Sequence, residues 1–252
     1  MKRCNPVPII IGSGCIVVVS ILIGWTANAA SPVKINTEIA SPVELIAEID
    51  SLLTTIREST LTAESYAEQH QQVKRNAIQI AIFAQTLAEH ETESPLKKSA
   101  PGLRNASLAL VRTTSYEEGM QSLARMREAM EGKQSGTPAV DIEWSKLASA
   151  STLMPILKVR SESIRRGFRR PKDPDVESRN ATAIALLALA AHGDLHLVKT
   201  PADRTVWQET CLELQTNMSR TASAIKTRDS SAADHFRLGM EACDKCHQKF
   251  KP

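Results

Sequence analysis

The sequence predicts an all-α protein, and composition and apolar spacing both point to that class. Aromatic residues make up only 4% of the 252 residues, whereas alanine and leucine are abundant. Sheets favour β-branched and aromatic side chains, so this composition favours helices. Apolar residues also recur at spacings of three and four along most of the chain, which is the period of a helix with one buried face.

The first thirty residues predict an export segment. Lys2 and Arg3 precede an uncharged, mostly apolar run over 8–25, and Ala27-Asn28-Ala29 matches the pattern that signal peptidase accepts. We therefore expect residues 1–29 to be a signal peptide. The alternative is an uncleaved anchor in the inner membrane, because an apolar run of this length is at the lower limit for spanning a bilayer. Either way, the body of the protein is expected in the periplasm.

Residues 41–131 predict a first helical bundle. Apolar spacing indicates helices over 43–56 and 73–90 and a shorter one over 103–111. A fourth helix should begin at Tyr116, because Ser115 and Glu118 form a capping-box pattern, with the cap residue followed three positions later by a glutamate.

The stretch 131–138 predicts a linker, because it contains two glycines and a proline but no apolar residue. We place this linker at 132–140 and a second domain at 141–252. Four further helices are expected in that domain, over 141–168, 177–192, 203–226 and 231–250. The short motif Arg75-Asn76-Ala77 recurs as Arg179-Asn180-Ala181, so the two halves are also candidates for a degenerate repeat.

The cysteines carry the most specific motif. The chain has five of them: Cys4, Cys15, Cys211, Cys243 and Cys246. Cys243 and Cys246 form a Cys-x-x-Cys pair followed at once by His247, the signature of covalent attachment of haem c. Residues three and four apart lie on one face of a helix, so both sulfurs and the imidazole can meet one porphyrin. A disulfide, a redox pair or half of a zinc site are the alternatives, although a zinc site would need further ligands.

The segment 239–250 (GMEACDKCHQKF), followed by Lys251, resembles the end of the class II c-type cytochromes, the cytochrome c-prime family. The resemblance extends loosely back to residue 141. It implies an antiparallel four-helix bundle that carries one covalent haem, with Cys243 and Cys246 as attachment points and His247 as an axial iron ligand. The bundle over 41–131 would then be a haemless one.

The resemblance also implies that the first helix of the bundle supplies the other side of the iron. Met154 is the candidate distal ligand on that helix, and the alternative is that it only fills the core. Lys146 stands nearest to the arginine that the family carries one turn earlier, if Ala150 faces the iron. For His192 and His196 we expect a solvent-facing or capping role rather than contact with haem.

Two further features of the sequence, a cysteine and a basic stretch, are not assigned a specific function. Cys211 is expected to be a buried thiol. We interpret the most basic stretch as a solvated helix end, because positive charges are stabilised at the C-terminus of a helix. The alternatives are that it pairs with haem propionates or docks an acidic partner. It consists of Arg160, Arg165, Arg166, Arg169, Arg170 and Lys172.

The sequence thus predicts a periplasmic carrier of single electrons that exchanges them with redox partner proteins. A five-coordinate haem protein that binds NO or CO and a haem subunit of a larger oxidoreductase complex are the alternatives. No nucleophile–base pair or nucleotide-binding loop indicates an enzyme in its own right. The net charge of +3 gives no reason to expect a nucleic-acid partner. Membrane association depends on retention of the N-terminal segment, and oligomerisation is left open.

Overall fold

The computed structural model describes residues 39–133 and 142–250, and these form eight α-helices and one 3₁₀ turn without a strand. The all-α prediction is confirmed. The predicted signal peptide at 1–29 and most of the predicted linker at 132–140 lie outside the described residues. None of the described helices is both long and apolar enough to cross a bilayer.

Three of the first four helices, α1, α2 and α4, begin at a residue whose side chain caps the helix. Ser41 caps α1 in a full capping box with Glu44, and Thr62 caps α2 in the same way. Ser115 caps α4 by accepting a hydrogen bond from the backbone N–H of Glu118, which confirms the predicted start at Tyr116. The Glu118 carboxylate, however, accepts from the N–H of Thr114. The bounds are α1 Pro42–Ser59, α2 Ala63–Glu89, α3 Ala100–Arg112 and α4 Tyr116–Met130.

The last four helices differ from the prediction mainly at their first member. The expected helix over 141–168 is wrong at its start, because a 3₁₀ turn occupies Trp144–Lys146 and the helix begins at Ala150. Ser149 is extended, and its hydroxyl accepts from the N–H of Thr152. This arrangement is that of an N-cap. The bounds are α5 Ala150–Arg169, α6 Pro174–Gly193, α7 Pro201–Thr227 and α8 Ala232–Phe250.

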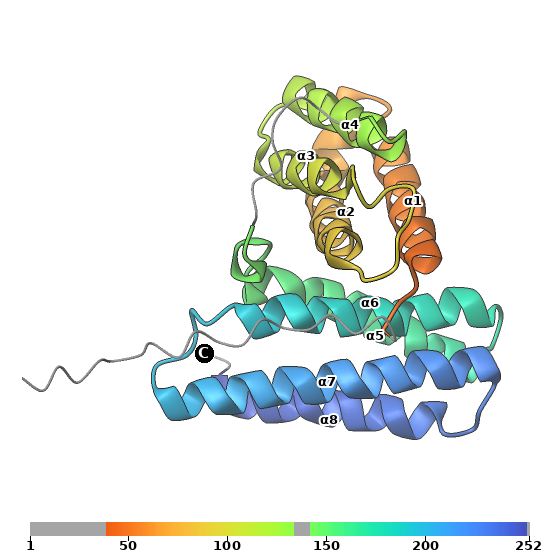
Figure 1. Ribbon diagram of the computed structural model, residues 1–252, viewed down its shortest axis with the longest axis vertical. Coiled ribbons are helices and arrows are strands. Elements are labelled where there is room, and N and C mark those ends of the chain that lie inside the picture. Colours follow the sequence, from red (N-terminus) through yellow and green to blue (C-terminus); the bar gives the residue numbers. More distant parts are fainter. Residues whose placement is uncertain (1–38, 134–141, 251–252) are drawn as a thin grey trace, which may run out of the picture. The chain divides into compact units, whose positions relative to one another are not determined.

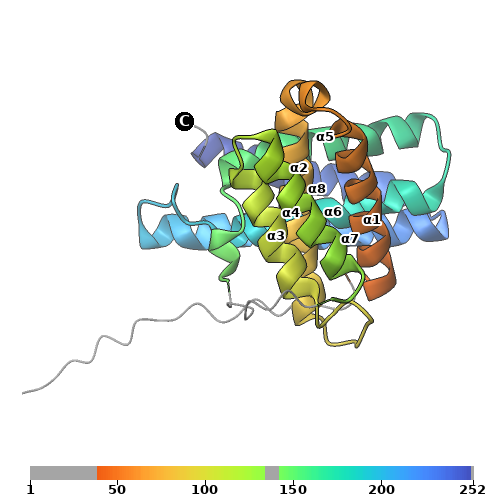
Figure 2. The ribbon, with the colours of Figure 1, turned by 90° about the horizontal axis from the view of Figure 1, so that it is seen from above.

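Helices pack mainly against their neighbours in sequence. Contacts join α1 to α2, α2 to α3 and α3 to α4, and then α5 to α6, α6 to α7 and α7 to α8. Figure 1 shows α5 to α8 running alongside one another, and Figure 2 shows α1 to α4 packed side by side. Below, the first four helices are called the N-terminal bundle and the last four the C-terminal bundle.

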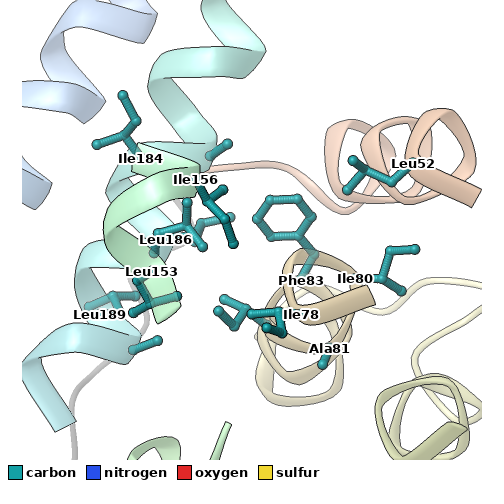
Figure 3. Packing of buried hydrophobic residues seen from close by; sticks show 14 of the residues in the cluster. Leu52, Ile78, Ile80, Ala81, Phe83, Leu153, Ile156, Ile184, Leu186 and Leu189 are labelled. Atoms are coloured by element: carbon teal, nitrogen blue, oxygen red, sulfur yellow. The ribbon is translucent and has the colours of Figure 1, made fainter. Parts of the chain in front are cut away.

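The two bundles share one compact unit and meet where α2 contacts α6. Phe83 and Ile78 of α2 are buried together with Ile156 of α5 and Leu186 of α6. Figure 3 shows these four side chains gathered at the contact. The side of α5 that carries Ile156 therefore faces the N-terminal bundle.

A polar cluster lies in the same contact and is centred on Arg160 of α5. Its guanidinium donates to Glu48 Oε1 at 2.5 Å, to Gln79 Oε1 at 2.7 and 2.9 Å and to Asn180 Oδ1 at 3.0 Å. Arg179 Nε lies 3.5 Å from the other oxygen of Glu48. Grouping Arg160 with the solvated helix end was therefore wrong, because its side chain is only 14% exposed and joins four helices.

Candidate functional site

Helix α8 presents the Cys-x-x-Cys-His motif from its packed side. Its buried residues Ala232, Phe236, Gly239 and Ala242 follow the three-and-four spacing, and Cys243 and Cys246 are half-buried beside them. Gly239 packs against α7, and a Cβ there would meet the flexible end of Met218. The side of α8 that carries the motif therefore lies against the neighbouring helix.

A cavity of about 630 Å³ lies in the C-terminal bundle, and Cys243, Cys246 and His247 all line it. Its walls come from α5, α6, α7, α8 and the loop between α6 and α7, and most of the lining is apolar. This volume falls within the range of about 300–1,000 Å³ typical of sites that bury a small molecule or cofactor. The motif therefore borders a space of suitable size and chemistry for a porphyrin.

The two motif thiols are free and lie in apolar surroundings. Burial raises the pKa of Cys243 to about 11, helped by the nearby Cys246 and Asp244. Burial likewise raises the pKa of Cys246. The thiolates that a zinc site or a nucleophile requires are therefore disfavoured here. A neutral thioether suits the same surroundings.

Contacts with α7 fix the last turns of α8, where His247 is exposed and also borders the cavity. The ring of Phe250 meets Trp207 edge-on at 5.1 Å between centroids, and Trp207 Nε1 donates to the Ala191 carbonyl at 2.9 Å. Lys249 pairs with Asp203 at 2.9 Å. The imidazole thus projects from a segment that α7 holds in place.

Helix α5 forms another wall of the cavity, and its lining residues Ala150, Met154, Leu157 and Ser161 share one face of the helix. The structure therefore brings Met154 to the same cavity as His247. Its role as a distal iron ligand stays a prediction. Lys158 and Arg165 also border the cavity and could pair with the carboxylates of a haem. Arg165 lies 5.7 Å from the centre of the Phe236 ring on α8.

Sequence reasoning named Cys211 and His196 but did not predict that they line the cavity. Cys211 is buried, as predicted, but it also lines the cavity together with Trp207 and Leu214, at a spacing on α7 that could have revealed the shared face. His196 lines the cavity from the loop after α6, where no periodicity marks it. His192, at the end of α6, is half-buried and does not line the cavity.

The rest of the basic stretch is exposed, as expected for a solvated helix end. It consists of Arg165, Arg166, Arg169, Arg170 and Lys172. Among the described residues, no three His, Cys, Asp or Glu side chains are grouped as ligands of a metal ion. A porphyrin brings the in-plane ligands of its iron, so the protein need supply only axial ones.

The chain was compared with family models, curated proteins and solved structures, and none of the three comparisons gives a significant match. The resemblance to class II cytochromes therefore rests on the motif segment 239–250 and on the helical character of the chain.

Proposed function

We propose that this protein is an exported mono-haem c-type cytochrome that carries single electrons in the periplasm. The observation that supports the proposal most directly is that Cys243, Cys246 and His247 border one apolar cavity of about 630 Å³. Two free thiols three residues apart on a helix, followed by a histidine, are the residues that covalent haem attachment requires.

In this proposal each thiol adds across one vinyl group of haem, so that a C–S bond forms and the thiol hydrogen passes to the vinyl group. The addition gives two neutral thioethers, which suit the buried positions of Cys243 and Cys246. His247 provides one axial nitrogen to the iron. When bound, haem supplies an iron that gains or loses one electron.

The remaining residues of the site determine the environment of the haem. The apolar walls contributed by α5, α6 and α7 keep water away from the centre of the bundle, and exclusion of water tunes the potential of a buried redox group. Lys158 and Arg165 offset the negative charge of the propionates. A partner protein would exchange electrons through the part of the bundle where His247 is exposed.

The test is to express the full chain, with its own N-terminal segment, in a bacterium that attaches haem c in its periplasm. The proposal expects a coloured periplasmic protein whose colour stays with the protein in acidified acetone. The mass should increase by that of one haem, and a redox titration should fit a one-electron couple. The C243A/C246A variant should be colourless. A colourless wild-type protein, or pigment that acid extracts completely, would refute the proposal, and a high-spin haem whose spectrum shifts on adding CO would favour the gas-binding alternative.

A further inference from the structure

The loop between α6 and α7 holds a histidine against a buried carboxylate at the edge of the cavity. Asp194 is only 7% exposed. Its Oδ2 accepts the N–H of Ala150, the first residue of α5, at 2.6 Å, and its Oδ1 accepts the N–H of His196 at 3.3 Å. Both oxygens lie 2.7 Å from Nδ1 of His196. Asp194 thus fixes the His196 ring relative to the start of α5.

This contact determines which ring nitrogen of His196 is available. Nδ1 donates its hydrogen to the carboxylate, which leaves Nε2 with a lone pair in the neutral ring. No hydrogen bond within the described residues engages Nε2. His196 lines the cavity with a side chain that is 47% exposed. Histidines that bind metals usually donate their other ring N–H to a carboxylate or carbonyl, as His196 does here.

Few other side chains that line the cavity can donate an electron pair to an iron. Met240 lies two turns before His247 on the same helix and therefore belongs to the same wall. Lys158 carries a protonated amine. Burial raises the pKa of Cys211 and keeps its thiol neutral. Met154 and His196 remain.

The surroundings of these two residues differ. Met154 is a half-buried residue on an apolar helix face, where methionine most often fills space. His196 has a buried partner that sets its tautomer and its orientation. We propose that His196, rather than Met154, is the second axial ligand of the iron, positioned by Asp194. This inference rests on the proposed function, since it requires a haem held by Cys243 and Cys246.

The experiment compares the full-length, haem-loaded wild type with H196A, M154L and H192A. His192 is a matched control, because it is a histidine at the same end of the bundle that does not line the cavity. Optical, electron-paramagnetic-resonance and near-infrared spectra report the spin state and whether the axial pair is two imidazoles or an imidazole and a thioether. The expected wild type is low-spin with two imidazoles. H196A should lose the low-spin spectrum and bind CO, while M154L and H192A should keep it.

Two further variants separate positioning from ligation. H196M should stay low-spin and show a higher potential, because a thioether ligand raises the potential relative to imidazole. D194N should keep the haem but show a mixture of spin states, because the ring loses its carboxylate partner. A high-spin wild type, an H196A spectrum equal to wild type, or loss of the low-spin form in M154L alone would overturn the proposal. A protein without covalent haem would instead overturn the proposed function, so the two failures are distinguishable.

Discussion

The N-terminal and C-terminal bundles each contain four helices that follow one another in the sequence, and the cavity described above lies in the C-terminal bundle. Leu123 and Met126 of α4 are buried and fill the middle of the N-terminal bundle. Cys243 and Cys246 of α8, spaced likewise by three, are half-buried and border the cavity. The comparison shows that the same arrangement of four helices can form either a packed core or a cavity that takes a ligand. The residues on the inward face of a helix contribute to this difference.

The first prediction has the largest expected effect and tests this difference between the bundles by preventing haem attachment. In C243A/C246A an unfilled space of about 630 Å³ would remain. The apolar walls that would pack against a porphyrin would then face water, which disfavours the packed arrangement of this bundle. We therefore expect the C-terminal bundle to lose cooperative packing while the N-terminal bundle keeps it. Hydrogen exchange resolved by helix measures this difference.

The control for that variant is C211A, which alters a cavity-lining thiol outside the motif. It should keep the haem and the exchange protection of α5 to α8. Equal hydrogen-exchange protection of the two bundles in colourless C243A/C246A would contradict the view that the C-terminal bundle needs a ligand in its cavity while the N-terminal bundle does not.

The second prediction concerns the cluster that joins the bundles. R160A removes the guanidinium that contacts Glu48, Gln79 and Asn180 and leaves the carboxylate of Glu48, only 11% exposed, without its closest partner. Breaking a buried pair costs about 3–5 kcal/mol, so for this slightly exposed one we expect about 2–3 kcal/mol of lost stability. Chemical denaturation followed by circular dichroism measures the loss.

Two companion variants test the cause of that loss. E48Q/R160M removes both charges and should recover most of the stability, since apolar replacement of a buried pair is often neutral. R166A removes an exposed arginine of the same helix, bonded only to Ser163 among the described residues, and should behave as wild type. A loss in R166A equal to that in R160A would show that general charge, not the cluster, matters.

The sequence predicted local features well and non-local ones poorly. The start of α4 at Tyr116 and the buried face of α8 follow from caps and spacing within a few residues. The start of α2 was predicted at 73 and is wrong, because the helix begins at Ala63 after the Thr62 cap. The start of α5 at Ala150 was missed because Lys146, Leu147 and Ala148 continue a helical pattern that the Ser149 cap overrides. Arg160 could not be placed, because its partners Glu48 and Gln79 lie far away in the chain. His196 borders the cavity through loop geometry, which leaves no periodic trace.

The third prediction compares one glycine in each bundle. An alanine Cβ at Gly119 would lie 3.1 Å from ring atoms of Tyr66, whose hydroxyl is bonded to Thr113 at 2.9 Å. At Gly239 it would meet the flexible end of Met218. Replacing a helical glycine by alanine favours the helix by about 1 kcal/mol in both cases. We expect G119A to lose about 1 kcal/mol of stability and G239A to stay within about 0.5 kcal/mol of wild type, because overpacking against a fixed ring costs more. Thermal unfolding of both variants measures the difference, and the opposite order would refute the explanation.

The fourth prediction has the smallest expected effect and concerns how stability depends on pH. It compares a histidine near the end of one helix in each bundle. Helix α2 is followed by His90, whose ring bonds the Ala40 carbonyl and the Thr92 N–H. The last turn of α6 contains His192, whose pKa is lowered by burial alone. The unfolded chain therefore binds a proton at His192 more readily than the folded one does. Stability from this residue is complete above its unfolded pKa of about 6.5 and decreases as the pH falls through the lower folded value. H192Q should flatten this decrease below about pH 6.5 without changing stability at pH 8, as measured by denaturation at each pH. An unchanged slope in H192Q would assign the acid sensitivity of the protein to other groups.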